Sequence, residues 1–276
     1  MDLECRIRVL ALGLTCAGAV ACTEWAPASD SLPEVNETML QGATGDTLGA
    51  DWSCLDSEPE PATAPTPSAA SVIYSLALVD LATTAPVTDA TVRACGLTDI
   101  TCAAPASNVI TPDDQGWISV PLASNFRGYL EITSPRMVPL IVPLPDGPLR
   151  TMRDYPMVLI SPESYIALVT ALQIQADPTS GGVAARAFDC QGNTAAGVTF
   201  SSNTSGVAWY FENGLPNRTR QQTDKDGLGG FAGTSPGVAL LGASLLDGTP
   251  VSSRSVFIRG GWITAAYLRP AAAPDF

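Results

Sequence analysis

Two acidic turns that end on glycine constrain the fold of this chain more than any other sequence feature. The first turn, residues 111–120, ends its acidic part on Gly116, and the second, residues 223–231, ends it on Gly227. Asp side chains bond the backbone two residues on, and glycine takes positive φ without steric cost, so each cluster reverses the chain before an apolar run. The two glycines lie about 110 residues apart, close to the size of one small β sandwich. We expect them to mark equivalent corners of two β domains.

The composition supports packed cores. The chain has 276 residues, of which 46% are hydrophobic and 15% charged, with a net charge of -13. That length gives room for about two domains of about 100 to 200 residues each. Binding to DNA, RNA or anionic lipid headgroups requires clustered Lys and Arg, so the charge predicts no nucleic-acid partner.

The N-terminus predicts export. Arg6 and Arg8 precede an apolar run, residues 9–20, which is shorter than the roughly 17 to 25 residues that span a bilayer. Ala19 and Ala21 lead into Cys22 and resemble the bacterial lipobox, although Ala19 stands where Leu is usual.

That resemblance implies a lipoprotein signal peptide over 1–21 and a lipid on Cys22, which would hold the mature chain to a membrane. Plain secretion with cleavage near Ala21 and an uncleaved anchor are the alternatives. The expected location is the outer membrane or cell surface, or a position facing the periplasm.

Besides the lipid-bearing Cys22, four cysteines remain after processing, and export places them in an oxidising compartment. They are Cys54, Cys95, Cys102 and Cys190, an even set with three possible pairings. Cys95 and Cys102 are close enough in sequence to clip one loop, and Cys54 with Cys190 follows by elimination. Free buried thiols are the alternative. A zinc site is not expected, because the chain has no histidine and no close Cys-x-x-Cys pair.

The segment 22–70 is predicted to be a disordered tether. It lacks a sustained period, and residues 57–68 are rich in Pro, Ala, Ser and Thr, a composition that favours an extended chain. Trp52 and Cys54 are exceptions, which either dock on the folded part or lie in a floppy leader.

The first β-sandwich domain is predicted over 71–161. The apolar run 72–79 indicates a strand buried on both faces, and turn signals at roughly 8 to 15 residues are typical of an all-β sandwich. Prolines at 139, 143 and 145 predict an edge strand, because a central strand needs those amide donors. The expected strands are 72–79, 90–95, 117–122, 129–133, 138–144 and 156–160.

A short helix and a turn, 162–181, are predicted to join the two domains. Ser161 is a suitable N-cap with Pro162 at the first helical position, and Tyr165, Leu168, Val169 and Leu172 recur on one face. The second β-sandwich domain is predicted over 182–270, with a tail at 271–276. Its expected strands are 183–190, 197–201, 206–211, 238–246, 251–259 and 262–268.

The pattern resembles the carboxypeptidase regulatory-like or transthyretin-like domain, among the prealbumin-like and CnaB-like β sandwiches. The resemblance rests on residues 85–92, 113–120 and 128–132, and in the second copy on 195–199 and 223–231. It implies two tandem Ig-like/prealbumin-like sandwiches that serve as spacers, adhesion modules or accessory domains. CnaB-like adhesins often carry a Lys-to-Asn or Asp isopeptide bond, but the one lysine, Lys225, lies in a polar turn, so no such bond is expected.

No catalytic residue and no cofactor is predicted. The absence of histidine excludes Ser-His-Asp and Cys-His chemistry. Glu131, Glu163 and Glu212 are the nearest candidates for paired carboxylates, and solvated surface acids are the favoured interpretation for all three.

Two ligand hypotheses remain. The acidic turns favour turn chemistry over weak calcium binding, because neither continues into a complete calcium loop, and no metal site is predicted. Trp209, Tyr210 and Phe211 form either core packing or a sugar-stacking platform, and at least one must face the core, because successive strand residues face opposite sides.

The sequence therefore predicts a non-enzymatic exported lipoprotein, anchored at Cys22, that acts as a spacer or as a protein-interaction or adhesion module. A carbohydrate-binding module of the cell envelope is the alternative. The expected partners are the membrane, through the lipid, and an envelope protein or polysaccharide.

Overall fold

The computed structural model describes residues 49–56, 71–145, 149, 152–212 and 214–270, all within one compact unit, Gly45–Phe276. The predicted signal peptide 1–21, Cys22, the tether residues 23–48 and 57–70, and the tail 271–276 lie outside the described residues. No described helix has both the length and the apolar character needed to cross a membrane.

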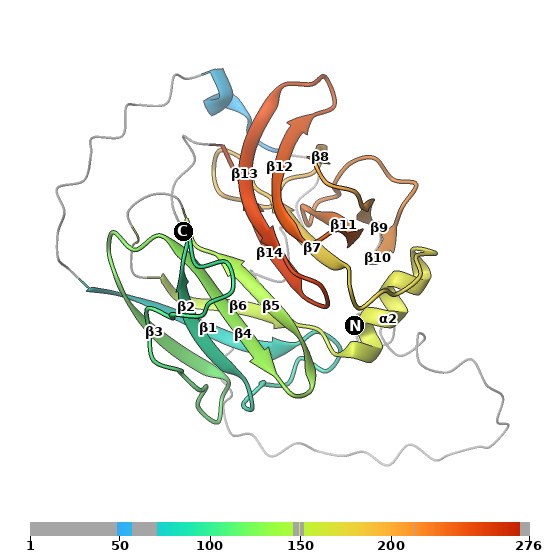
Figure 1. Ribbon diagram of the computed structural model, residues 1–276. Coiled ribbons are helices and arrows are strands. Elements are labelled where there is room, and N and C mark those ends of the chain that lie inside the picture. The colour runs from blue at the N-terminus through green and yellow to red at the C-terminus, as the bar shows by residue number, and fades with distance from the viewer. Residues whose placement is uncertain (1–48, 57–70, 146–148, 150–151, 213, 271–276) are drawn as a thin grey trace, which may run out of the picture. The chain divides into compact units, whose positions relative to one another are not determined.

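The described chain is all-β with a short helix, as the sequence predicts (Figure 1). We call Ser71–Leu159 the first lobe; it contains β1 (Ser71–Asp80), β2 (Thr91–Gly96), β3 (Trp117–Ala123), β4 (Gly128–Ser134), β5 (Met137–Pro143) and β6 (Met152–Leu159). We call Gly181–Leu268 the second lobe; it contains β7 (Gly181–Ala187), β8 (Val198–Ser202), β9 (Val207–Glu212), β10 (Leu215–Asn217), β11 (Leu228–Thr234), β12 (Gly237–Leu245), β13 (Pro250–Ile258) and β14 (Ile263–Leu268).

The two lobes repeat one strand arrangement. In the first lobe β1 lies between antiparallel β3 and parallel β6, and in the second lobe β7 lies between antiparallel β11 and parallel β14. The facing layers correspond as well, because β4 lies between β2 and β5 just as β12 lies between β8 and β13. Each lobe is therefore a two-layer sandwich of the same topology.

The acidic glycine turns occupy the same corner in both lobes. Gly116 has φ +76° and its carbonyl accepts from the amide of Leu78 at 2.9 Å, whereas Gly227 has φ +65° and its carbonyl accepts from the amide of Ala187 at 2.9 Å. The prediction that these two glycines mark equivalent corners is confirmed.

One sheet runs through both lobes. Within the described residues the sheet order is β10-β9-β11-β7-β14-β5-β4-β2, with three-stranded sheets β3-β1-β6 and β13-β12-β8 as the outer layers. The lobes meet where β14 pairs in parallel with β5 at Ile263↔Leu140 and Thr264↔Ile141. The predicted domain boundaries, 71–161 and 182–270, stay a prediction, since a continuous sheet offers no gap at which to test them.

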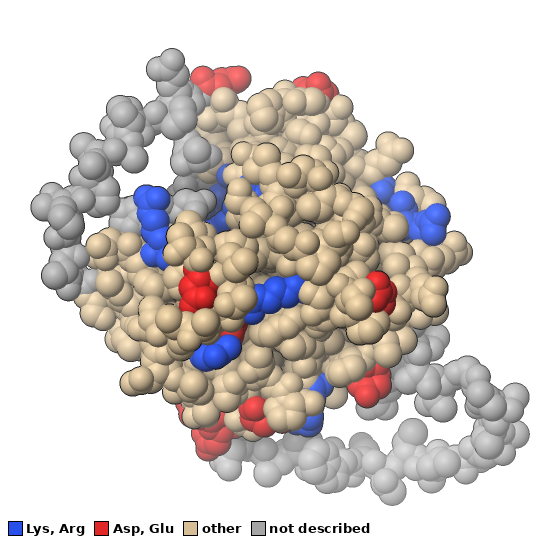
Figure 2. Space-filling model, viewed as in Figure 1, with Lys and Arg blue, Asp and Glu red and all other residues tan. Residues whose placement is uncertain are grey.

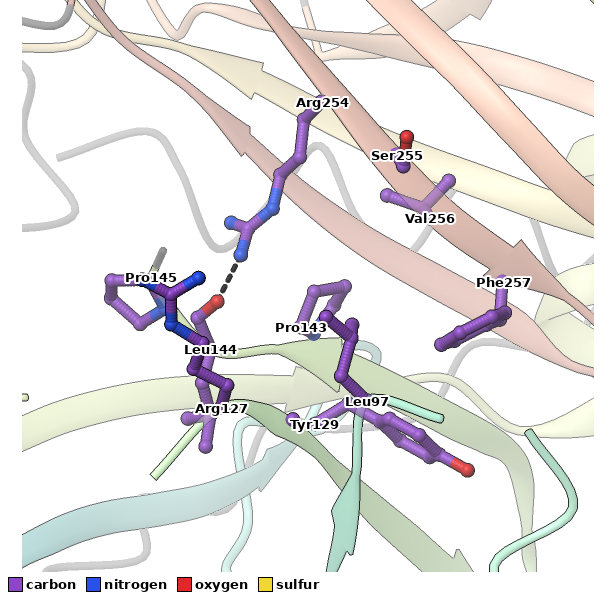
Figure 3. A pocket seen from close by; sticks show the side chains of 11 residues that line it. Leu97, Arg127, Tyr129, Pro143, Leu144, Pro145, Arg254, Ser255, Val256 and Phe257 are labelled. Atoms are coloured by element: carbon purple, nitrogen blue, oxygen red, sulfur yellow. Dashed lines mark hydrogen bonds between the residues drawn. The ribbon is translucent and has the colours of Figure 1, made fainter. Parts of the chain in front are cut away.

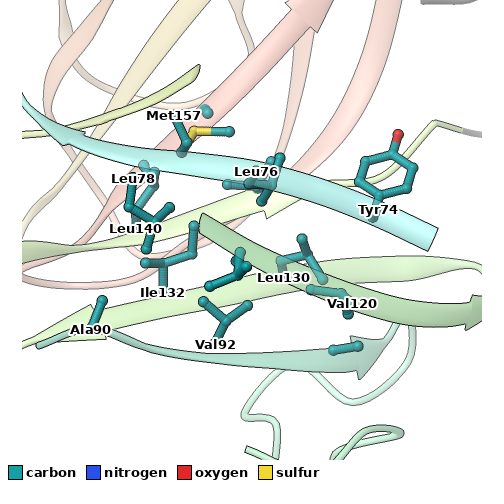
Figure 4. Close-up of a cluster of buried hydrophobic side chains, with 14 of the residues drawn as sticks. Tyr74, Leu76, Leu78, Ala90, Val92, Val120, Leu130, Ile132, Leu140 and Met157 are labelled. Carbon is teal, nitrogen blue, oxygen red and sulfur yellow. The ribbon is translucent and has the colours of Figure 1, made fainter. Parts of the chain in front are cut away.

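Each sandwich has its own core, and the last strand contributes to both. Alternate residues of β1, among them Tyr74, Leu76 and Leu78, point into the first core (Figure 4). Ala266 and Leu268 of β14 belong to the second core, whereas Ala265 belongs to the first. A single strand thus closes both lobes.

Two strand predictions were wrong in detail. β1 is buried on one face only, and Ile73 is 47% exposed, because β1 lies in an outer layer of the sandwich. β5 is not an edge strand, because it pairs with β4 on one side and with β14 on the other. Its prolines limit the pairing of β5, because the short pairing with β14 falls between Pro139 and Pro143.

The helix α2 (Pro162–Ala171) is confirmed with its predicted cap. The Ser161 hydroxyl accepts from the amide of Ser164, and Pro162 stands in the first turn. Val169 and Leu172 pack with Ala232 of β11. The helix therefore covers the second lobe directly after the chain leaves the first.

Candidate functional site

The contact between the two lobes, which we call the joint, combines ion pairs, a disulfide and aromatic rings. It consists of Arg93, Cys95, Cys102, Tyr129 and Glu131 of the first lobe with Phe257, Arg259 and Trp262 of the second. Strand alternation builds it, because Val92 and Ala94 of β2 face the first core and thereby turn Arg93 and Cys95 to the opposite face. β4 does the same for Tyr129 and Glu131, so this strand is buried on both faces.

Glu131 is the charged centre of the joint. Its side chain is 1% exposed, and its two carboxylate oxygens accept from Arg93 and from Arg259. Arg93 stands directly opposite it on β2, whereas Arg259 follows β13 of the other lobe. A buried carboxylate is costly unless it is paired and hydrogen-bonded, so this arrangement makes the second lobe part of the first lobe's charge balance.

Aromatic rings hold Arg259 in place. Its guanidinium lies 5.6 Å from the ring centroid of Tyr129 and 5.0 Å from that of Trp262, within range of a cation–π contact. It also donates to the Tyr129 hydroxyl at 2.8 Å. Burial raises the pKa of Tyr129, and its hydroxyl donates onward to the Asp99 carbonyl.

The disulfide Cys95–Cys102 closes a loop, residues 95–102, which we call the ring, and the ring supplies the acceptors for these donors. The Asp99 carbonyl accepts from the Tyr129 hydroxyl at 2.5 Å, and the Ile100 carbonyl accepts from Arg259, with Nε at 3.0 Å. The ring therefore contacts the second lobe directly through the Ile100 carbonyl and through the packing of Cys95 and Cys102 near Phe257 and Trp262, and it supports Tyr129 through the Asp99 carbonyl.

A small hollow lies at the edge of the joint (Figure 3). It is lined by first-lobe residues such as Leu97 and Leu144 and by second-lobe residues such as Arg254 and Phe257, and Arg254 crosses it to donate to the Leu144 carbonyl. The hollow has a cavity volume of about 20 Å³, room for about one water molecule. Its geometry favours contact between the lobes over ligand binding.

The joint also contains a potential metal-ligand set. The sulfurs of Cys95 and Cys102 and a carboxylate oxygen of Glu131 lie within 4.8 Å of one another. The sulfurs are bonded to each other and the carboxylate is engaged by two guanidinium groups, so these donors are already committed to the joint.

Residues 49–56, which we call the leader, are fastened to the second lobe. The sequence had left open whether Trp52 and Cys54 dock on the folded part or lie in a flexible segment. Cys54 forms the predicted disulfide with Cys190, and Trp52 packs against the second core beside Ala50 and Leu55. The Asp51 amide donates to the carboxylate of buried Asp189 at 3.2 Å, and the Cys190 amide donates to the Asp51 carbonyl at 2.8 Å. Residues 49–56, with the short 3-10 helix η2 (Ser53–Asp56), are thus docked rather than floppy.

The aromatic run is divided between two faces of β9. Tyr210 is buried in the second core, where its hydroxyl accepts from the Phe200 amide at 2.8 Å, so the prediction that at least one ring is core is confirmed. Trp209 and Phe211 lie on the other face, half-buried, with ring centroids 5.5 Å apart. Trp209 packs near α2 beside Val169 and Leu172.

The remaining candidate residues lie on the surface or in turns. Lys225 is 73% exposed and pairs with Asp226 at 3.1 Å, and the Asp113 carboxylate accepts backbone amides of its own turn, including that of Trp117 at 2.8 Å. Glu163 is exposed, and Glu212 pairs with Arg220. The lipidation candidate Cys22 lies outside the described residues.

Glu131 corrects the sequence interpretation, because it is buried rather than solvated. A signal was available, since Glu131 interrupts the apolar run from Tyr129 to Ile132. Its partner Arg259 is 128 residues away in the chain, and no local pattern connects the two.

Charged side chains on the face drawn in Figure 2 are scattered singly rather than gathered into a basic patch. The described surface in this view accordingly offers no electrostatic footprint for a nucleic acid.

No protein-family model matches the chain, and no curated protein matches it. Among solved structures it is similar to the shaft pilin SpaA from Lactobacillus rhamnosus GG, at 11% identity over 73% of this chain and 98% of that one, with a TM-score of 0.26. It is also similar to GBS52, the minor pilin of Streptococcus agalactiae, at 12% identity over 74% of this chain and 98% of that one, with a TM-score of 0.23. These TM-scores are low, so the fold assignment rests on the strand order of the chain itself.

Proposed function

We propose that the protein is a non-enzymatic lipoprotein, exported and anchored through Cys22, that acts as a spacer or as a protein-interaction or adhesion module of the cell envelope. The observation that carries the proposal is the joint, because a buried ion cluster and a shared sheet hold two sandwiches as one body. A body of fixed length suits a spacer. The resemblance of each lobe to carboxypeptidase regulatory-like domains is part of the same proposal.

Export is supported by the cysteines. Both disulfides, Cys54–Cys190 and Cys95–Cys102, are formed, and structural disulfides are typical of oxidising compartments. Residues 49–56 are joined to the second lobe by the Cys54–Cys190 disulfide and by the hydrogen bond from the Cys190 amide to the Asp51 carbonyl, so an anchor at Cys22 would be linked to the folded part through that lobe.

Anchoring is tested by comparing the wild-type protein with Cys22→Ala in the native host. The wild-type mature protein should gain the mass of a lipid and fractionate with membranes, and the variant should appear in the soluble fraction. Absence of the lipid mass, or unchanged membrane fractionation of the variant, would refute the anchor.

The spacer role is tested by small-angle scattering of the whole mature chain without its lipid. The wild-type protein should give one maximum dimension in low and high salt, and Arg259→Ala should give a broader distribution of distances. A wild-type distribution as broad as that of the variant would argue against a body of fixed length.

A carbohydrate-binding module is the second candidate, and the β9–β10 hairpin favours it. This hairpin lies between β8 and β11, where the first lobe has the ring instead, and it carries Trp209 and Phe211 on one half-buried face. Binding on a glycan array that disappears in Trp209→Ala but survives in Tyr165→Phe would support it, and a blank array would leave the spacer ahead.

A further inference from the structure

The ring is one of the contacts by which the first lobe holds the second, and the Cys95–Cys102 disulfide closes it. Two consecutive ring carbonyls, those of Asp99 and Ile100, point at donors of the joint. The acceptors are main-chain atoms, so their positions are set by the backbone of the ring and not by the rotamer of any side chain.

The backbone of the ring is held in a conformation that its sequence does not favour. Cys102 has φ +51°, a left-handed conformation that is unfavourable for a non-glycine residue. Such a conformation persists only where the surroundings impose it. The contacts at this turn are the bond to Cys95, the hydrogen bond from the Cys102 amide to the Asp99 carbonyl at 3.0 Å, and the Asp99 carboxylate, which accepts from the amides of Ala103 and Ala104.

Opening the Cys95–Cys102 disulfide would affect the second lobe through a few hydrogen bonds. The Arg259 guanidinium donates to Ile100, to Tyr129 and to Glu131, and the Tyr129 hydroxyl donates on to Asp99. If the ring relaxes, Arg259 loses the Ile100 carbonyl and Tyr129 loses the Asp99 carbonyl. The guanidinium that pairs with buried Glu131 is then positioned by fewer hydrogen bonds.

We propose that the Cys95–Cys102 disulfide is a redox-sensitive latch on the joint, which fixes the second lobe against the first when oxidised and loosens it when reduced. Only the biological purpose of this latch rests on the proposed function, because loosening the joint would change the length that a spacer spans. The latch itself is a property of the folded chain and holds in the absence of any anchor.

The co-reactant is a dithiol, and the exchange balances. A dithiol gives two electrons and two protons to the Cys95–Cys102 bond, the sulfur–sulfur bond opens to two thiols, and the dithiol closes to a cyclic disulfide. Cys95 is 0% and Cys102 2% exposed, so the exchange has to wait for a local opening of the ring.

The second disulfide supplies a matched control. Cys54–Cys190 joins the docked segment 49–56 to the second lobe, and neither cysteine belongs to the joint. We compare the double variant Cys95→Ser/Cys102→Ser with Cys54→Ser/Cys190→Ser by amide hydrogen exchange of the whole mature chain. The segment 259–263, whose amides include that of Trp262 bonded to the Arg259 carbonyl, reports on the joint, and the β12 strand reports on the intact second core.

The ring variant should speed exchange of segment 259–263 at least tenfold and leave β12 unchanged. The control variant should leave segment 259–263 at the wild-type rate and speed exchange near Asp51 and Cys190. The proposal would be overturned if segment 259–263 of the ring variant exchanged at the wild-type rate. It would also be overturned if the exchange rate of this segment rose equally in both variants.

Reduction of the wild-type protein keeps the test decisive if the ring variant fails to fold. Dithiol treatment followed by alkylation and peptide mass analysis identifies which disulfide has opened, and exchange is measured on the same sample. Loosening of segment 259–263 should follow the opening of Cys95–Cys102, and in Arg259→Lys, which lacks the Nε donor, reduction should add little. Opening of the ring with an unchanged segment 259–263 would refute the latch. Membrane fractionation of Cys22→Ala reads the proposed function alone, so either idea can fail without the other.

Discussion

Glu131 and Arg259 form a buried ion pair between residues that stand 128 positions apart in the chain and in different lobes. Because the carboxylate is 1% exposed, its charge has to be balanced locally. The pair therefore couples the folding of one lobe to the presence of the other.

Arg259→Ala should lower the free energy of unfolding by about 2 to 3 kcal/mol. Removing one partner of a buried pair costs about 3 to 5 kcal/mol, and the remaining contact from Arg93 reduces that loss. Urea denaturation measures it. The control is Arg136→Ala, which removes an exposed pair with Asp89 and should cost under about 1 kcal/mol; equal costs for the two variants would contradict the role of the joint.

Gly→Ala substitutions should separate two losses of unfolding free energy: the loss caused by positive φ and the loss caused by collision of the added Cβ with neighbouring atoms. An added Cβ at Gly227 would lie 2.5 Å from the Ala187 carbonyl oxygen, and one at Gly116 2.7 Å from that of Leu78. Each Gly→Ala change should cost about 2 to 4 kcal/mol, from positive φ and collision together.

Two other glycines are the controls for this series. Gly192 has φ +84° with nothing within 4 Å, so Gly192→Ala should cost about 1 kcal/mol. Gly96 has open space and no positive φ in the range that disfavours side chains, so Gly96→Ala should stay within about 0.5 kcal/mol of wild type. Thermal unfolding ranks all four variants, with the Gly116 and Gly227 variants expected to be the least stable, then the Gly192 variant, then the Gly96 variant. Clearly different costs at Gly116 and Gly227 would show that the two corners are not equivalent.

Opening the leader disulfide should destabilise the second lobe. Cys54–Cys190 spans a sequence separation of 136 residues, and cross-links across loops of this length stabilise by about 3 to 5 kcal/mol. Cys54→Ser/Cys190→Ser should therefore lower the urea midpoint and raise the mobility of Trp52, measured by fluorescence anisotropy with the other tryptophans changed to Phe. An immobile Trp52 in that variant would mean that apolar packing alone docks the leader.

The pH dependence of stability should change sign between two aspartates. Burial raises the pKa of Asp224 above the ordinary value of 3.8, so the ionised carboxylate opposes folding above its folded pKa and this cost vanishes as the pH falls toward 3.8. Asp224→Asn keeps an oxygen acceptor for the Asp226 amide and should stabilise the fold at pH 7 by about 0.5 kcal/mol or less, after solvent screening.

Asp177 supplies the opposite case. Hydrogen bonds, first from the Thr179 side chain, hold the pKa of Asp177 below 3.8, so its contribution is present above 3.8 and is lost as the pH falls through the folded pKa. Asp177→Asn should accordingly lower the melting temperature at pH 7 and leave it unchanged near pH 2. Melting curves from pH 2 to pH 8 check both variants, and parallel curves for the two would contradict the assignment.

Local chemistry made much of the fold predictable. Gly116 and Gly227 located the repeat, Ser161 and Pro162 located the helix, and Cys95 and Cys102 were close enough in sequence to identify their partner. Strands β10 and β11 were not predicted, because Pro216 and the glycines of Leu228–Thr234 lower strand propensity. In β11 two of those glycines, Gly229 and Gly230, lie in close contact with neighbouring strands, so tertiary packing overrides propensity there.

The joint could not be predicted, and the reason is its sequence separation. Arg259 follows β13 and Glu131 lies in β4, and although Glu131 interrupts an apolar run, no local pattern identifies Arg259 as its partner. Only the pairing of β14 with β5 brings them together, and that pairing covers two residues between prolines. Nothing in the local pattern of either strand indicates it.

The position of β14 in the chain has a consequence for biogenesis. Chains emerge from the N-terminus and usually fold in that order, yet the first core includes Ala265, and Glu131 needs Arg259. The first lobe therefore stays unsealed throughout emergence and is completed only when the last strand of the described chain arrives. Chaperones and proteases would thus meet an incomplete first sandwich during most of the synthesis of the chain, and a defect in β14 would disturb the lobe that is made first.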